Sequence, residues 1–189
     1  MSCRRKTLKS LFVAFICVSL ISGMGNYARG HVEPDMPDAI AEMEYQILLD
    51  IKPDDFQIRY LLGMVYFRQK KYDLAVEELQ RVIEAAPNYS YAYTGLGQVE
   101  LSHQEYEKAI EYFRKAIAIQ PDDNHVYYFL GQALEARGER AEAEKAYLVA
   151  IDNHKKIKVG EKEKKNYEKD LARFQAALDA LRSTGNTEN

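Results

Sequence analysis

The chain has 189 residues, of which 47% are hydrophobic and 29% charged, the composition of a folded domain with a sizeable buried core. Its formal net charge of −3 gives no electrostatic reason to expect nucleic acid as a partner. Both cysteines, Cys3 and Cys17, fall within the first 25 residues. The rest of the chain therefore has no disulfide, no thiol nucleophile and no cysteine metal site.

Residues 1–25 have the three-part layout of an export signal. Four basic residues come first (Arg4, Arg5, Lys6 and Lys9), an apolar run follows at 11–21, and small residues end the segment. The run is shorter than the roughly 20 residues that cross a bilayer, which favours a cleaved signal peptide over an N-terminal membrane anchor. We expect an exported protein, periplasmic or secreted if the source is bacterial, with anchoring by this segment as the alternative.

Residues 26–36 show no periodicity and are predicted to be a flexible leader. Pro37 then begins a predicted helix over about 37–51. Its Ala41, Tyr45 and Leu49 lie 34 residues before Ala75, Leu79 and Ile83. This helix therefore matches the second half of an incomplete repeat, and we expect it to cap the N-terminal end of a repeat array.

A period of 34 residues runs through the middle of the chain. It is marked by Gly63, Gly97 and Gly131, and by alanines twelve residues after each glycine (Ala75, Ala109 and Ala143). A glycine inside a helix costs about 1 kcal/mol relative to alanine, so three in register need a common cause. We expect close packing, in which each glycine faces the alanine of the neighbouring helix.

Each 34-residue unit is predicted to contain two helices. Short polar turns divide the units at 68–71, 102–105 and 137–140, and Gly138 suits a left-handed position after a helix end. Each second helix carries one bulky residue (Leu79, Phe113 and Tyr147), and Pro87 and Pro121 end the first two of these helices. The expected capping residues that follow are Asn88 and Ser90 in one case, and Asp122 and Asp123 in the other.

With these residues the chain resembles the tetratricopeptide repeat family, whose unit is a helix–turn–helix of this period. The resemblance implies an all-α fold, an α-α superhelix of three repeats at about 56–89, 90–123 and 124–157. The whole domain would span 37–182, with capping helices at about 37–51 and 161–182 and a disordered tail at 183–189. Two departures occur in the third unit: Arg140 replaces the tyrosine after the turn, and Lys155 replaces the closing proline.

The C-terminal helix is predicted to have one narrow apolar stripe. Its members are spaced 4, 3, 4 and 3 residues apart: Tyr167, Leu171, Phe174, Leu178 and Leu181. We expect this helix to cap the last repeat, and the alternative is a seam for a homo-oligomer or a partner helix through 167–181. The lysines at 155–169 are interleaved with acidic residues, which is typical of a solvated face; a docking patch for an anionic surface is the alternative.

The family resemblance also implies which side chains line the concave surface of the array. The implied peptide-binding groove is nearly uncharged and rich in aromatic and amide groups. It consists of Gln57, Tyr60, Met64, Phe67, Tyr91, Thr94, Gln98, Leu101, His125, Tyr128, Gln132 and Glu135. Relatives that bind the C-terminal carboxylates of heat-shock chaperones use lysine, arginine and asparagine on this surface, so we expect no carboxylate clamp here.

No arrangement of residues indicates catalysis. The four histidines are not spaced as ligands on one helix face, and Gly95-Leu96-Gly97 lacks the strand that precedes a phosphate-binding loop. We therefore predict no catalytic residues, no metal and no cofactor. The predicted function is a non-catalytic protein–protein interaction scaffold of the cell envelope that binds a peptide or helix of another protein. The alternative is a structural or assembly subunit of an envelope secretion or pilus complex, with contacts through the C-terminal helix. Membrane contact would come only from an uncleaved N-terminus.

Overall fold

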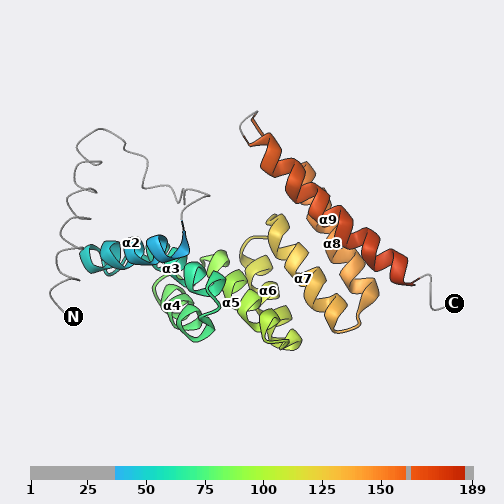
Figure 1. The fold of residues 1–189 in the computed structure, drawn as a ribbon. Helices are drawn as coiled ribbons and strands as arrows, with labels where there is room; N and C mark the ends of the chain where they lie inside the picture. Colours follow the sequence, from blue (N-terminus) through green and yellow to red (C-terminus); the bar gives the residue numbers. More distant parts are fainter. Residues whose placement is uncertain (1–36, 161–162, 186–189) are drawn as a thin grey trace.

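The computed structural model describes residues 37–160 and 163–185, so the predicted signal and leader and the last four residues lie outside it. The described part contains eight α-helices and no strand (Figure 1). The helices are α2 (Asp38–Ile51), α3 (Phe56–Arg68), α4 (Tyr72–Ala85), α5 (Ser90–Ser102), α6 (Tyr106–Ile119), α7 (Asn124–Ala136), α8 (Arg140–Lys155) and α9 (Lys164–Gly185).

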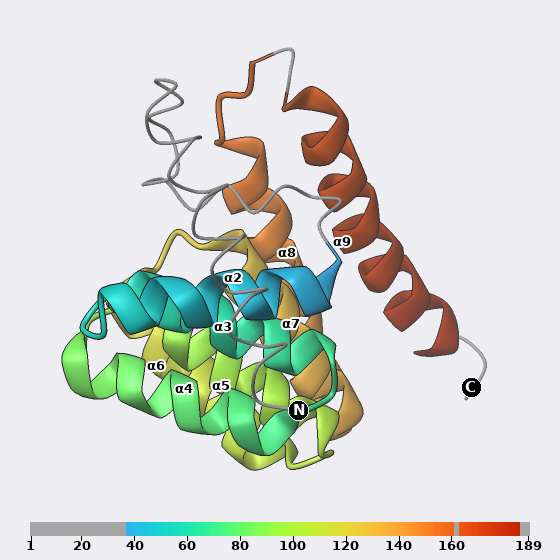
Figure 2. The same cartoon turned by 60° about the vertical axis from the view of Figure 1, so that its left-hand side comes forward.

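The helices form successive pairs that stack along one direction. Within pairs, α3 packs on α4, α5 on α6 and α7 on α8, and the pairs join through α4–α5 and α6–α7 contacts. Helix α2 packs on α3 at one end and α9 packs on α8 at the other (Figure 2). The predicted all-α superhelix of three helix–turn–helix units is confirmed.

Two of the predicted helix caps are present and one is not. The Asp55 carboxylate accepts hydrogen bonds from the backbone N–H groups of Gln57 and Ile58 at 3.1 and 3.2 Å. Asp123 likewise accepts from the His125 N–H at 2.9 Å. The expected capping of α5 by Asn88 or Ser90 is wrong, because Tyr89 occupies that position without a side-chain cap. The Ser90 hydroxyl instead donates to the Gln120 side chain at 2.8 Å.

The turns inside the three units share one left-handed residue. Lys70, Gln104 and Gly138 are spaced by 34 residues and have φ values of 60°, 63° and 88°. The prediction for Gly138 is confirmed. In the first two units, side chains occupy a backbone conformation that costs least for glycine.

The recurring glycines pack against the bulky residues of the second helices, and the predicted pairing with alanine is wrong. A Cβ atom at Gly97 would lie 2.5 Å from the Phe113 ring, and one at Gly131 would lie 2.5 Å from the Tyr147 ring. At Gly63 the nearest side chain is Leu79, at 3.2 Å. A large side chain needs the missing Cβ more than an alanine does, which is why each glycine faces the residue 16 positions later.

The two departures of the third unit from the repeat pattern both involve α9. No proline stands at position 155, so α8 has 16 residues where α4 and α6 have 14, and its extra turn carries the buried His154. Arg140 donates hydrogen bonds to the backbone carbonyl of Leu181 and, at 3.0 Å, to the Thr184 hydroxyl. The last turn of α9 is thereby bound to the first turn of α8.

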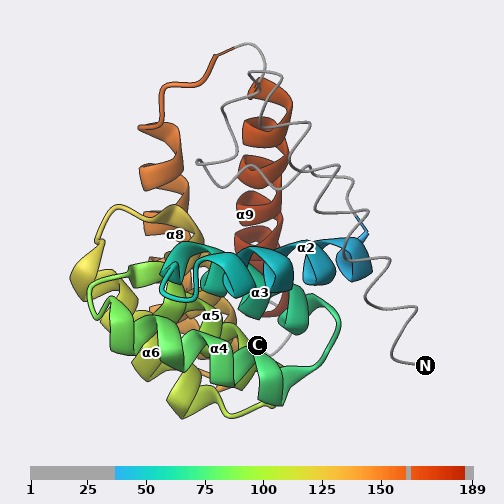
Figure 3. The ribbon, with the colours of Figure 1, turned by 90° about the vertical axis from the view of Figure 1, so that its left-hand side faces the viewer.

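Helix α9 runs antiparallel beside α8 (Figure 3). It continues to Gly185, so residues 183–185 are helical and not part of a disordered tail as predicted. The hydroxyls of Ser183 and Thr184 donate to the carbonyl of Ala180 at 2.9 and 3.3 Å. These bonds, together with those from Arg140, satisfy carbonyls that a helix end otherwise leaves without partners.

Candidate partner-binding groove

Four aromatic rings form a continuous cluster where α3 meets α5. Tyr89 lies 5.3 Å from Phe56, 5.4 Å from Tyr60 and 5.4 Å from Tyr91, measured between ring centroids. Tyr60 and Tyr91 are 6.1 Å apart. The tilted and edge-on arrangements are those that aromatic pairs prefer. This set, Phe56, Tyr60, Tyr89 and Tyr91, is called the ring cluster below.

Sequence reasoning identified Tyr60 and Tyr91 but missed Phe56 and Tyr89. The 34-residue register gave no signal for Tyr89, because Asp55 and Asp123 occupy the equivalent positions. Burial, with the neighbouring Tyr89, Tyr91 and Asp123, raises the pKa of Tyr60, so its hydroxyl keeps its proton and can donate a hydrogen bond. Tyr91 is 40% exposed and presents the cluster to a partner.

The other predicted groove residues of the first two units differ in exposure. Gln57 is exposed, whereas Met64, Phe67, Gln98 and Leu101 are partly buried. Phe67 packs on Tyr72 of its own repeat, with ring centroids 6.0 Å apart. Thr94 is buried and donates to the Ser90 carbonyl at 3.2 Å. The accessible surface thus centres on Gln57 and Tyr91.

In the third unit, α9 covers most of the predicted groove. Tyr128 is only 8% exposed, because the Phe174 ring lies 5.0 Å away and the Arg173 guanidinium lies over its face at 4.7 Å. Gln132 donates to the Tyr128 hydroxyl at 3.2 Å. Glu135 accepts from the Tyr147 hydroxyl at 2.7 Å. Three of the four groove positions of this unit are therefore engaged in contacts within the chain.

His125, the fourth position, faces charged residues of α9. Its Nδ1 lies 3.2 Å from the Arg173 guanidinium, and its Nε2 lies 3.9 Å from the Asp170 carboxylate. Burial lowers the His125 pKa, which Asp170 and Asp123 partly oppose by favouring the protonated ring. The neutral form is therefore favoured beside Arg173.

His154 is a buried polar contact between α8 and α9 that sequence reasoning missed. Its ring stacks on Tyr167 at 4.2 Å, its Nδ1 bonds the Asn124 amide, and its Nε2 lies 2.9 Å from the Tyr167 carbonyl oxygen. The sequence placed it in a lysine-rich link, where nothing marked it as buried. These bonds fix the position of α9 along α8.

The apolar stripe of α9 is buried within its own chain. Phe174 is 0%, Leu178 5% and Leu181 2% exposed, and all three belong to the core cluster that includes Tyr147 and Ile151 of α8. The stripe caps the last repeat. In this structure it offers no free seam for the homo-oligomer or assembly contact that the sequence left open.

Nothing in the described helices suggests metal or membrane chemistry. Among residues 37–160 and 163–185, no three His, Cys, Asp or Glu side chains lie close enough together to hold a metal ion. In the same part of the chain, no helix has both the length and the apolarity needed to cross a membrane.

A family model for the tetratricopeptide repeat matches residues 35–90, 60–124 and 94–156. The chain therefore belongs to the tetratricopeptide repeat family. No curated protein sequence matches it. The fold and family define a protein-interaction scaffold, and the related structures described next are non-catalytic scaffolds of the same kind.

Three solved structures illustrate the similarity. A crystal structure of MamA is 31% identical, with a TM-score of 0.56 over 63% of this chain and 70% of that chain. MamA residues 41 to the end from Desulfovibrio magneticus RS-1 are 19% identical, with a TM-score of 0.57 over 94% and 89%. SycD, a type III secretion translocator chaperone from Yersinia enterocolitica, is 20% identical, with a TM-score of 0.60 over 71% and 88%. The last two show the shared fold alone.

Proposed function

We propose that this protein is an exported, non-catalytic scaffold of the cell envelope that binds a segment of another protein on the surface formed by α3 and α5. The observation that carries the proposal is the ring cluster, in which Tyr91 is 40% exposed while its three neighbours are partly buried. Export is inferred from the basic, apolar and small-residue order of residues 1–25.

The chemistry of this surface suits a peptide. Tyrosine gives a large contact area at a low cost in side-chain entropy, and its hydroxyl adds one hydrogen bond. The ring cluster is held by its own contacts before a partner arrives, so little ordering is needed on binding. The exposed amide of Gln57 can pair with the backbone of an extended or helical segment.

A photo-crosslinking residue placed at position 91 in living cells tests the groove. We expect a crosslinked protein from position 91 and none from Gln80, an exposed residue of α4 that serves as the matched control. Equal crosslinking from both positions would remove the ring cluster from the account.

Export is tested separately by cell fractionation. We expect the full chain outside the cytoplasm, with a mature N-terminus near residue 26, and we expect deletion of residues 1–25 to keep it inside. A full chain that stays in the cytoplasm would refute export without affecting the groove.

A further inference from the structure

The segment 154–173, called the basic segment below, differs in charge from the rest of the chain. It contains eight Lys and Arg residues against four Asp and Glu residues, in a protein whose formal net charge is −3. It comprises the last residues of α8, the connection to α9 and the first half of α9. A partner with acidic groups would be attracted to this region and repelled by most of the remaining surface.

Three lysines of the basic segment are exposed and have no ion pair within the described residues: Lys164, Lys165 and Lys169. Elsewhere in that part of the chain, Lys71 is paired with Glu42 at 2.9 Å and Lys108 with Glu105 at 3.5 Å. Unpaired, exposed cations keep their charge available to an incoming carboxylate.

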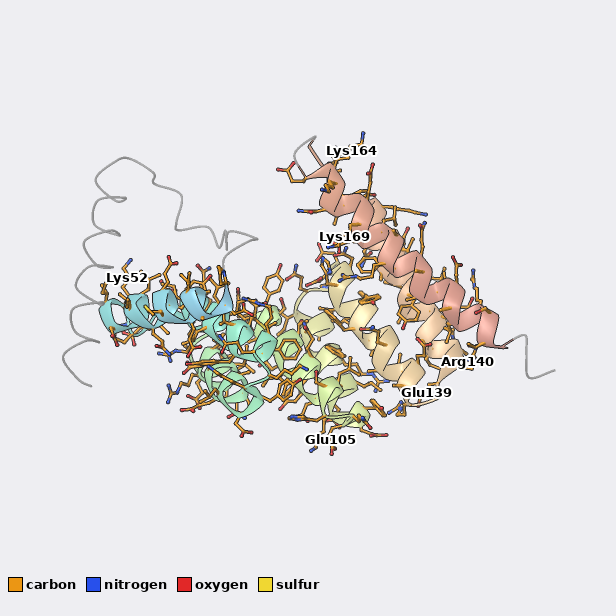
Figure 4. All side chains as sticks on the ribbon, viewed as in Figure 1. Lys52, Glu105, Glu139, Arg140, Lys164 and Lys169 are labelled. Carbon is orange, nitrogen blue, oxygen red and sulfur yellow. The ribbon has the colours of Figure 1, made fainter. Side chains whose placement is uncertain are left out.

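Helix α9 places part of this charge beside the groove. Lys165, Lys169 and Arg173 are four residues apart and so lie along one side of the helix. Lys169 borders a hollow with Asn166, Asp170 and Arg173, and the last two contact His125 of α7. Figure 4 shows Lys169 near the first turn of α7 and Lys164 at the far end of α9.

The first turn of α7 connects the ring cluster to this side of α9. Asp123, which caps α7, is close enough to Tyr60 to help raise the tyrosine pKa. His125, two residues later, contacts both Asp170 and Arg173. Aromatic surface on α3 and α5 is therefore followed by cationic surface on α9, along a single side of the array.

We propose that the partner is a protein segment with two parts: apolar or aromatic residues that lie on Tyr91, and acidic residues that lie against Lys165 and Lys169. This inference rests on the proposed function, since it assigns the chemistry of the segment that the groove binds. Lys169 lies among Asn166, Asp170 and Arg173 beside a groove, which suits a peptide carboxylate better than an anionic membrane surface.

Selection from a random dodecapeptide library on the full chain tests the inference. The selected peptides are expected to contain both aromatic and acidic residues. The double variant Lys165→Glu/Lys169→Glu should weaken the binding of a selected peptide about tenfold, with a strong salt dependence for the wild type. Lys145→Glu, an exposed charge reversal on α8, is the matched control and should change affinity less than twofold.

Tyr91→Ala separates this inference from the proposed function. If Tyr91→Ala weakens binding but the selected peptides lack acidic residues and the double variant binds normally, the acidic part is wrong and the groove stands. If neither variant changes binding, both proposals fail. Phosphatidylglycerol vesicles test the membrane: loss of vesicle binding in the double variant, with peptide binding intact, overturns the inference in favour of a lipid surface.

Discussion

Tyr60 and Tyr128 occupy the same position in the first and third repeats, yet only the first belongs to an open surface. Tyr60 packs on Tyr89 and beside the 40% exposed Tyr91, whereas Tyr128 lies under Phe174 and Arg173 of α9. The difference teaches that the repeat supplies the ring, and the next element along the array decides whether a partner can reach it.

The contacts that hold α9 differ in kind from those between repeats. Between the first and second repeats, Leu79 packs against Gly95, where an added Cβ would lie 3.0 Å from it. At α8–α9 the contacts are a stacked His154–Tyr167 pair, the Phe174 ring and hydrogen bonds from Arg140. A helix outside the repeat pattern thus depends on specific side chains for its position.

Removing the Phe174 ring should have the largest effect, because it breaks the contrast between the two ends. Phe174→Ala leaves a cavity under a fully buried side chain and should cost about 3 kcal/mol of unfolding free energy in urea. Hydrogen exchange should show α9 losing protection first, with Tyr128 becoming exposed. Gln175→Ala, on the exposed face of the same helix, should change stability by less than about 0.5 kcal/mol. Equal losses in both variants would contradict the cap.

Alanine at the recurring glycines tests the connection between the two regions. Gly97→Ala should destabilise by about 2 kcal/mol, because its Cβ would enter the Phe113 ring, which itself stacks on Phe129 of α7 at 6.1 Å. Gly63→Ala should be close to neutral, since the flexible Leu79 lies 3.2 Å away and alanine favours the helix by about 1 kcal/mol. Thermal unfolding of the two variants side by side measures the difference, and the reverse order would refute the assigned glycine contacts.

Arg140→Ala should release only the end of the cap. The variant loses bonds to the Leu181 carbonyl and the Thr184 hydroxyl, a cost of about 1 kcal/mol at a partly exposed site. Hydrogen exchange at 181–185 should speed up while the Tyr167 end of α9 stays protected. A uniform change along α9 would show that Arg140 does not act locally.

The smallest expected effect is a pH dependence from His125 at the boundary between the two regions. Because burial lowers its pKa in the folded chain, the unfolded chain binds this proton more readily. The stability that the neutral ring contributes is present above about pH 6.5 and is lost as the pH falls through and below that value. Between pH 7.5 and 5.5, the wild type should lose stability relative to His125→Gln in urea unfolding. A relative gain would mean that Asp170 outweighs burial.

Much of the fold could be predicted because the repeat writes its packing into a fixed spacing. The 34-residue interval of the glycines, together with Asp55 and Asp123 at helix starts, was enough to divide the chain into helix pairs. The candidate site was less predictable. Tyr89 lies off the register, and burial of Thr94 and Tyr128 depends on neighbours that spacing does not reveal.

The sequence by itself determined the helices, their pairing within units and the presence of one buried stripe on the last helix, because these depend on local periodicity. Only the tertiary structure decided that each glycine meets a bulky side chain, that His154 is buried, and that α9 covers Tyr128. The physical reason is that a periodic pattern shows which face of a helix is buried, whereas the surface that buries it comes from residues distant in the sequence.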